Sequence, residues 1–249
     1  MQHILGYNTV DNRRTTLKRI FESAVRDEII RLNPLSNGRI KNTSVRKTAT
    51  TCLSVEQVAD ILSNLPRLAT LQQRLIIALH IFTGVRRQEL LSLMWKDINL
   101  VSDTVHIQRA VVYYNGVLIK EPKTSQSNRY IPICKELHDL LVQHERRTGY
   151  VLSEDGSAPL PLELYNENMD EIRRTINLYG AHSREFRRTF ASLKIAAGVP
   201  LPVEQADMGH AKPTMTLQAY AKVEKHSWEN SREAIPDLVT SHSSTKASR

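Results

Sequence analysis

The sequence lacks the features that would place it in a membrane, in a secretory pathway or around a metal. It has no apolar run near the roughly 20 residues that span a membrane. Met1–Val10 shows no charged start followed by a long apolar stretch, so we expect no secretory signal. The two cysteines, Cys52 and Cys134, lie far apart and outside any metal-ligand spacing, which favours reduced thiols over a disulfide. No cluster of carboxylates offers a metal site. We therefore predict a cytoplasmic protein with no membrane partner, no metal and no cofactor.

Positive charge is what the sequence has in excess. The formal net charge is +8, and residues 1–50 contribute +6 of it through ten Lys or Arg and four Asp or Glu. Cationic side chains in one segment displace counterions from a phosphate backbone, so a nucleic-acid partner is the leading hypothesis. A solvated basic surface would explain the charge equally well, and charge alone does not decide between them.

Apolar spacing predicts several helices. The predicted ranges are Thr16–Leu32, Val55–Leu65, Gln72–Phe82 and Arg87–Met94. Asn33-Pro34 would end the first because proline cannot continue a helix. Ser54 and Gln57 form a capping box at the start of the second. Arg39–Thr51 has no periodicity and is rich in Lys, Arg and Thr, so we interpret it as a basic linker.

The middle of the chain predicts a small sheet. Thr104–Tyr113, Val117–Lys120 and Arg129–Ile133 are rich in β-branched and aromatic residues, and Asn115-Gly116 favours a tight hairpin turn. From Lys135 the sequence is mainly helical, with breaks at glycine and proline. The predicted fold class is mainly α with a small antiparallel β-sheet (α+β).

The first motif that can carry chemistry is TGVRRQEL, at Thr83–Leu90. Gly84 lets the chain turn sharply after an apolar helix and leaves Arg86 at the edge of the core. A guanidinium there can hold two phosphate oxygens. The alternative is a surface arginine that pairs with Glu89.

The second motif is Pro122–Arg129, which leads into a predicted strand. Lys123 would lie on a hairpin loop, from which an ammonium can donate a proton to a leaving alkoxide. The alternative is a solvated lysine.

The third motif is REFRRTFAS, at Arg184–Ser192. The i, i+3 spacing puts Arg184 and Arg187 on one helix face, and two like charges there suggest a phosphate between them. Phe186, Phe190 and Leu193 would anchor the other face. The alternative is an ordinary basic helix.

The fourth motif runs from Met208 to Val223. Gly209 is typical of a helix end, and His210 would be an exposed imidazole just beyond it. Tyr220 follows ten residues later on a predicted short helix. A lone tyrosine in a helix is usually a packing residue, so this motif says little by itself.

Together these residues make a phosphoryl-transfer site chemically reasonable. Tyrosine is a poor nucleophile because its reference pKa is about 10. Arg86 and Arg187 around a phosphate would offset the negative charge that develops during attack by Tyr220. His210 could hydrogen-bond the phosphate or the phenol, and Lys123 could protonate the departing 5′ oxygen. No step needs a metal.

The order of the four motifs resembles the tyrosine recombinase family, which includes phage integrases and the recombinases that resolve chromosome dimers. The resemblance runs from about Leu53 to Val223. It implies two catalytic arginines, a hairpin lysine, a histidine and a nucleophile at Arg86, Arg187, Lys123, His210 and Tyr220. It also implies the family's catalytic fold in residues 50–235. Residues 236–249 are rich in Ser and Thr and have no apolar pattern, so we expect a flexible tail there. Residues 1–45 would be the closing part of a helical core-binding domain with its basic linker.

Two positions depart from the family pattern. The family's His-x-x-Arg box usually starts with histidine, but Arg184 stands there, and His182 lies five residues before Arg187 instead of three. An arginine can donate to phosphate but stays protonated and cannot act as a base. The His210–Tyr220 interval is also one residue longer than in many relatives. The short N-terminal part is expected to reflect a truncated gene product or a cloned fragment.

The resemblance implies a site-specific integrase that cleaves and rejoins DNA through a 3′-phosphotyrosine. Implied partners are double-stranded attachment sites and three further copies of the chain in a homotetramer on DNA, at the bacterial nucleoid. A DNA-bending host factor or an excisionase stays open as an additional partner. Two alternatives remain: a catalytically impaired relic that binds or regulates DNA, motivated by Arg184, and a type IB topoisomerase that relaxes supercoils without a specific site.

Overall fold

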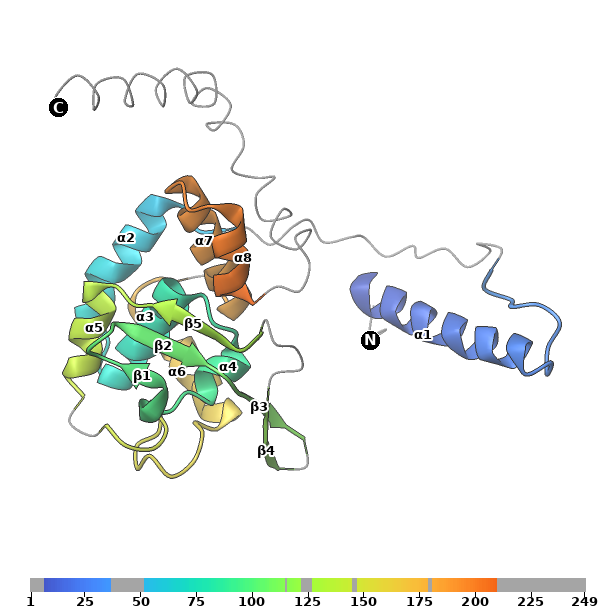
Figure 1. Cartoon of the computed structure of the whole chain (residues 1–249), viewed down its shortest axis with the longest axis horizontal. Coiled ribbons are helices and arrows are strands. Elements are labelled where there is room, and N and C mark those ends of the chain that lie inside the picture. The colour runs from blue at the N-terminus through green and yellow to red at the C-terminus, as the bar shows by residue number, and fades with distance from the viewer. Residues whose placement is uncertain are drawn as a thin grey trace, which may run out of the picture. The chain divides into compact units, whose positions relative to one another are not determined.

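The computed structural model describes residues 7–36, 52–114, 116–121, 127–144, 147–178 and 181–209 of the chain. These fall in two compact units, Met1–Thr50 and Thr51–Arg249. The first unit contains the helix α1 (Tyr7–Arg26), and the second contains the other described helices and strands (Figure 1). The predicted class, mainly α with a small antiparallel component, is confirmed.

The helix α1 begins and ends earlier than the predicted range Thr16–Leu32. The chain leaves the helix through Glu28, whose φ of 57° is left-handed, and the next amide, that of Ile29, donates to the Ala24 carbonyl at 2.9 Å. Ile29 and Leu32, which extended the apolar pattern, are 73% and 81% exposed. The prediction was wrong because these two apolar residues continue the period without lying on the helix.

The helix α3 (Leu71–Thr83) is the centre of the second unit. Its residues Leu75–Leu79 are fully buried, and it packs against α5 (Lys135–Val142) and α7 (Ser183–Ala196). The other helices are α2 (Val55–Asn64), α4 (Arg87–Leu91), α6 (Leu162–Thr175) and α8 (Leu201–Met208), with 3-10 turns at Leu65–Arg67 and Trp95–Asp97. The predicted capping box of α2 is confirmed, because Ser54 and Gln57 exchange hydrogen bonds of 3.2 and 2.9 Å.

The helix α4 ends at Leu91, three residues before the predicted Met94. After that point the backbone pairs with a distant segment: the Trp95 amide donates to the Gly149 carbonyl, and the Val151 amide donates to the Leu93 carbonyl, both at 2.9 Å. Tertiary pairing therefore replaces the last helical turn that the apolar pattern suggested.

The strands form two separate sheets. The first has the order β1-β2-β5, with β1 (Ile98–Asn99), β2 (Thr104–Ile107) and β5 (Arg129–Pro132), and the second pairs β3 (Ala110–Tyr113) with β4 (Val117–Lys120). All described pairs are antiparallel. The predicted hairpin is confirmed by the pairing of Tyr113 with Val117. In Figure 1 this hairpin projects as a ribbon from the body of the second unit.

The predicted strand Thr104–Tyr113 was wrong as one strand, because the chain breaks at Gln108-Arg109. Both side chains bind the buried Asp97: Gln108 Nε2 donates to it at 2.8 Å, and the Arg109 guanidinium donates at 2.5 and 2.9 Å. The break separates β2 from β3 and turns the single predicted sheet into two. The apolar residues Val105, Ile107, Val111 and Tyr113 keep the same alternating phase on both sides of the break, so only Arg109 interrupts the pattern.

A glycine at the end of α3 shapes the path to Arg86. Gly84 has φ 58°, and a Cβ there would lie 2.4 Å from Cδ1 and 2.8 Å from Cγ of Phe190. We expect Gly84→Ala to lower the free energy of unfolding by about 3 kcal/mol, since it combines left-handed strain with a clash in the core. Urea denaturation measures this. Gly198→Ala is the control, because Gly198 has φ 81° with open space around its Cβ. Equal losses in the two variants would show that contact with Phe190 is unimportant.

Candidate active site

Arg86 lies at the start of α4, directly after the turn at Gly84 and Val85. Its Nη1 donates to Glu89 Oε1 at 2.7 Å, and its backbone amide donates to Glu89 Oε2 at 2.9 Å. The pairing that the sequence offered as the alternative is therefore present. The Arg86 side chain is nevertheless 39% exposed, so the guanidinium remains accessible to an anion from outside.

Arg187 lies on α7 and is only 8% exposed. Its Nη1 donates to the Gly84 carbonyl at 2.7 Å, and its Nη2 donates to the Met208 carbonyl. Burial, together with the positive charges of Arg86 and Arg129, lowers its pKa to about 9. The guanidinium therefore stays charged at neutral pH, and an anion brought next to it would relieve the cost of its burial.

Arg184 differs from Arg187 in its surroundings. It is exposed, whereas the aromatic residues Phe186 and Phe190 of the same helix are buried, as predicted. The contacts within the described part of the chain join Arg187, and not Arg184, to the residues around Arg86. His182 is no substitute, because it lies exposed at the start of α7 with its Nδ1 2.9 Å from Arg173 Nη2.

Arg129, which sequence reasoning left without a role, completes the cluster together with Glu89. Arg129 is 6% exposed, and its Nη2 and Nη1 donate to Glu89 at 2.9 and 3.3 Å. Burial alone would raise the pKa of Glu89, but the hydrogen bond and charge of Arg129, with the charge of Arg86, lower it to about 2. Glu89 is thus a carboxylate shared by two arginines. An arginine at an inward position of a strand, beside buried Ile131, was the signal that could have identified Arg129.

The end of α8 lies among the three arginines. Its last carbonyls accept hydrogen bonds in succession: Asp207 from Arg129 Nε at 2.6 Å, Met208 from Arg187, and Gly209 from Arg86 Nη2 at 3.5 Å. Carbonyls at a helix C-terminus lack partners within the helix and form the negative end of its dipole, so cations stabilise them.

The predicted helix end at Gly209 is confirmed by its φ of 58°. His210, the next residue, lies outside the described part of the chain, as do Lys123 and Tyr220. The structure therefore brings Arg86 and Arg187 to the carbonyls of Gly209 and Met208, the two residues that precede His210. The assembly of these arginines with Lys123, His210 and Tyr220 stays a prediction.

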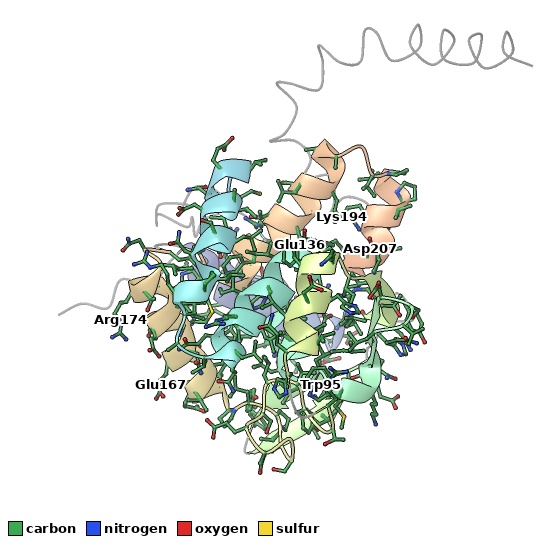
Figure 2. The ribbon with its side chains drawn as sticks, turned by 90° about the vertical axis from the view of Figure 1, so that its left-hand side faces the viewer. Trp95, Glu136, Glu167, Arg174, Lys194 and Asp207 are labelled. Atoms are coloured by element: carbon green, nitrogen blue, oxygen red, sulfur yellow. The ribbon has the colours of Figure 1, made fainter. Side chains whose placement is uncertain are left out.

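A buried carboxylate lies behind this end of α8. Glu204 is fully buried, and neither of its carboxylate oxygens has a hydrogen-bond partner among the residues described. Burial raises its pKa to about 8, with a further contribution from Asp207, while Lys194 and Arg187 act in the opposite direction. Asp207 is itself paired with Lys194 of α7, as Figure 2 shows, so Lys194 satisfies one of the two carboxylates. Glu204 is therefore mainly protonated at neutral pH.

This carboxyl should make stability depend on pH. Its folded pKa of about 8 exceeds the ordinary value of 4.5, so its stabilising effect is complete below 4.5 and is lost as pH rises towards 8. Relative to Glu204→Gln, we expect the parent to lose about 2 kcal/mol of unfolding free energy between pH 5.5 and 7.5. Urea denaturation at both pH values measures this. Glu167→Gln, on the exposed side of α6 (Figure 2), controls for removing a surface charge, and parallel curves for parent and Glu204→Gln would refute the assignment.

Metal ligands are not grouped in the described part of the chain: no cluster of three His, Cys, Asp or Glu is found there. Nor does any helix among the same residues have the length and apolarity needed to cross a membrane.

Comparison with known proteins places this cluster in a family. Residues 51–227 match the model of the phage integrase family. The ICEBs1 integrase of Bacillus subtilis is 22% identical over 96% of this chain and 68% of its own length, and the transposase of Tn916 from Enterococcus faecalis is 24% identical over 87% of this chain and 58% of its own. The chain thus spans about two thirds or less of these relatives.

Solved structures share the fold. The Tn1549 transposon integrase in complex with a circular intermediate DNA superposes with a TM-score of 0.80 at 22% identity, covering 93% of this chain and 80% of that one. A lambda integrase fragment bound to a core site superposes with a TM-score of 0.58 at 17% identity, covering 83% and 70%. The family model covers most of the chain and includes all three arginines of the cluster, so the chain belongs to the phage integrase family of tyrosine recombinases.

Proposed function

We propose that this chain is the catalytic part of a site-specific recombinase that integrates or excises a mobile element through a phosphotyrosine at Tyr220. The observation that carries the proposal is the convergence of Arg86 and Arg187, about 100 residues apart in sequence, on the end of α8 that leads into His210. A phosphate bound at this point would meet two guanidiniums that the fold already holds in place, which limits the reorganisation that its transition state requires.

The reaction requires no cofactor. The phenol of Tyr220 loses its proton to solvent as its oxygen bonds to the scissile phosphorus, the bond from phosphorus to the 5′ oxygen breaks, and Lys123 donates a proton to that oxygen. Arg86 and Arg187 stabilise the added negative charge, and His210 donates a hydrogen bond to the phosphate. The phosphotyrosine conserves the energy of the broken bond, so a 5′ hydroxyl of another strand can attack it and release Tyr220.

Arg184 takes a different role from the usual histidine. Because it is exposed and permanently charged, it can donate to a phosphate but cannot accept a proton. We assign it to phosphate binding. Arg184→His therefore separates an active enzyme from an impaired relic: cleavage that appears only in that variant would show that the parent has lost activity.

The substrates follow from the solved relatives. The Tn1549 integrase was solved with circular intermediate DNA and the lambda integrase fragment as a dimer on a core site. By analogy, this chain would bind duplex attachment sites of its element at the bacterial nucleoid and assemble as a homotetramer, with a DNA-bending host factor or an excisionase as an additional partner.

The direct test uses nicked duplexes that carry the end sequences of the encoding element. In such a substrate the strand beyond the nick diffuses away after cleavage, so the covalent intermediate accumulates. We expect an adduct that survives denaturing electrophoresis and maps by mass spectrometry to Tyr220. An adduct on another residue, or relaxation of supercoiled plasmids that lack these ends, would contradict the proposal.

A further inference from the structure

Arg129 connects three segments that carry the predicted active site. It is the first residue of β5, six positions after Lys123, and its guanidinium is bonded to Glu89 and to the Asp207 carbonyl. Its Nη1 also donates to the Ser127 carbonyl at 3.2 Å, which anchors the residues just after the Lys123 loop.

These bonds leave Arg129 little capacity to bind DNA itself. Its four described hydrogen bonds, two to Glu89 and one each to Asp207 and Ser127, use four of the five N–H donors of a guanidinium. Its side chain is only 5% exposed. Arg86, by comparison, is 39% exposed, so Arg86 can meet a phosphate from outside while Arg129 is enclosed.

Arg129 binds the carboxylate of Glu89, and the same carboxylate binds Arg86. Glu89 accepts from the side chain and the backbone amide of Arg86 at 2.7 and 2.9 Å, so the position of Glu89 sets that of Arg86. On its other side Arg129 holds the Asp207 carbonyl, three residues before His210. One planar group thus fixes the spacing between the segment of Arg86 and the end of α8.

We propose that Arg129 is a positioning residue for DNA cleavage, which sets Arg86 through Glu89 and the approach to His210 through the Asp207 carbonyl, without touching the scissile phosphate. This inference rests on the proposed function and adds to it a residue that acts only through others. It requires the fork of a guanidinium, because the ammonium of a lysine is a single point that cannot reach both partners in the same geometry.

The experiment measures the first-order rate of adduct formation on the nicked duplex at saturating DNA, and separately the Kd for the same duplex. We expect Arg129→Lys to slow cleavage about tenfold and Arg129→Met about a hundredfold, with Kd changed less than threefold, because misplaced catalytic groups act on the chemical step. Thermal melts establish that each variant folds.

Arg109→Met is the matched control. Arg109 is also largely enclosed, with 14% of its side chain exposed, and it binds Asp97 with two hydrogen bonds just as Arg129 binds Glu89. It has no described hydrogen bond or ion pair with α8 or with Glu89. We expect its loss to lower the melting temperature as Arg129→Met does, while the cleavage rate stays within threefold of the parent.

A double-mutant cycle tests the route through Glu89. If Arg129 acts through that carboxylate, the double variant Glu89→Gln, Arg129→Met will lose less cleavage rate than the product of the fold-losses of the two single variants. Neighbouring residues in one network are not additive. Arg109→Met combined with Glu89→Gln should be additive.

The outcomes separate this inference from the proposed function. A parent protein that forms no adduct on Tyr220 defeats the proposed function and this inference with it. A parent that cleaves, with Arg129→Lys equally fast, overturns only the role of Arg129. So does an equal loss of rate in Arg129→Met and Arg109→Met, or a failure of both Arg129 variants to fold, since each would reduce Arg129 to a structural residue.

Discussion

Replacing Tyr220 by phenylalanine is expected to remove all covalent adduct and all strand transfer. The change deletes only the oxygen that would attack phosphorus, so the proposed reaction loses its nucleophile. Binding should survive, since affinity for duplex DNA comes mainly from cationic contacts with the phosphate backbone. We expect the Kd of Tyr220→Phe for the nicked duplex to stay within about threefold of the parent.

The measurement pairs denaturing electrophoresis with a mobility-shift titration on the same duplex. Tyr114→Phe is the matched control, because Tyr114 is a tyrosine of the second unit that is 78% exposed near the tip of the β3–β4 ribbon. It should form as much adduct as the parent. Residual adduct in Tyr220→Phe would mean that another residue attacks the phosphate.

Replacing Arg187 by glutamine is expected to slow cleavage at saturating DNA by about a thousandfold, comparable to the loss of one strong electrostatic donor in a transition state. Arg187 is enclosed, and the fold already holds it against Gly84 and Met208, so its charge needs no reorganisation during the reaction. Arg187→Lys should recover little of the rate, because lysine presents one compact ammonium, whereas the two Nη atoms of Arg187 reach the Gly84 and Met208 carbonyls separately.

Stability has to be separated from catalysis in this variant, since Arg187→Gln also removes hydrogen bonds to two carbonyls. Arg173→Gln is the control: Arg173 likewise donates to a backbone carbonyl, that of Ala181, but belongs to α6 and has no described contact with the arginine cluster. Urea denaturation should show losses in both variants, whereas the cleavage rate should fall only in Arg187→Gln. A similar fall in both rates would assign the effect of Arg187 to folding.

Sequence reasoning located the elements of the second unit well where local chemistry decides them. The capping box at Ser54 and the left-handed glycines at 84 and 209 are local signals, and the structure confirms each. Sequence reasoning failed where contacts between distant residues decide where an element begins or ends. Asp97 breaks the predicted strand by binding Gln108 and Arg109, and no pattern within 104–113 records that acceptor.

The site shows the same division. Motif order identified Arg86 and Arg187, which the structure brings together, but it could not separate Arg187 from Arg184, because helical spacing fixes a face and not its depth of burial. Arg129 and Glu204 were missed for a related reason. Arg129 belongs to the site through partners far away in sequence, Glu204 lies buried behind it, and a charged residue in a sequence does not reveal that it will be buried.

The independence of the two sheets has a consequence for engineering. No strand of the β3–β4 ribbon pairs with β1, β2 or β5, and all four residues of β4 are exposed, while Tyr113 secures β3 by donating to the Leu160 carbonyl at 2.5 Å. Lengthening the ribbon at its tip therefore shifts no register in the body of the protein. The tip is the natural insertion point for a fluorescent reporter that would follow assembly on DNA in real time.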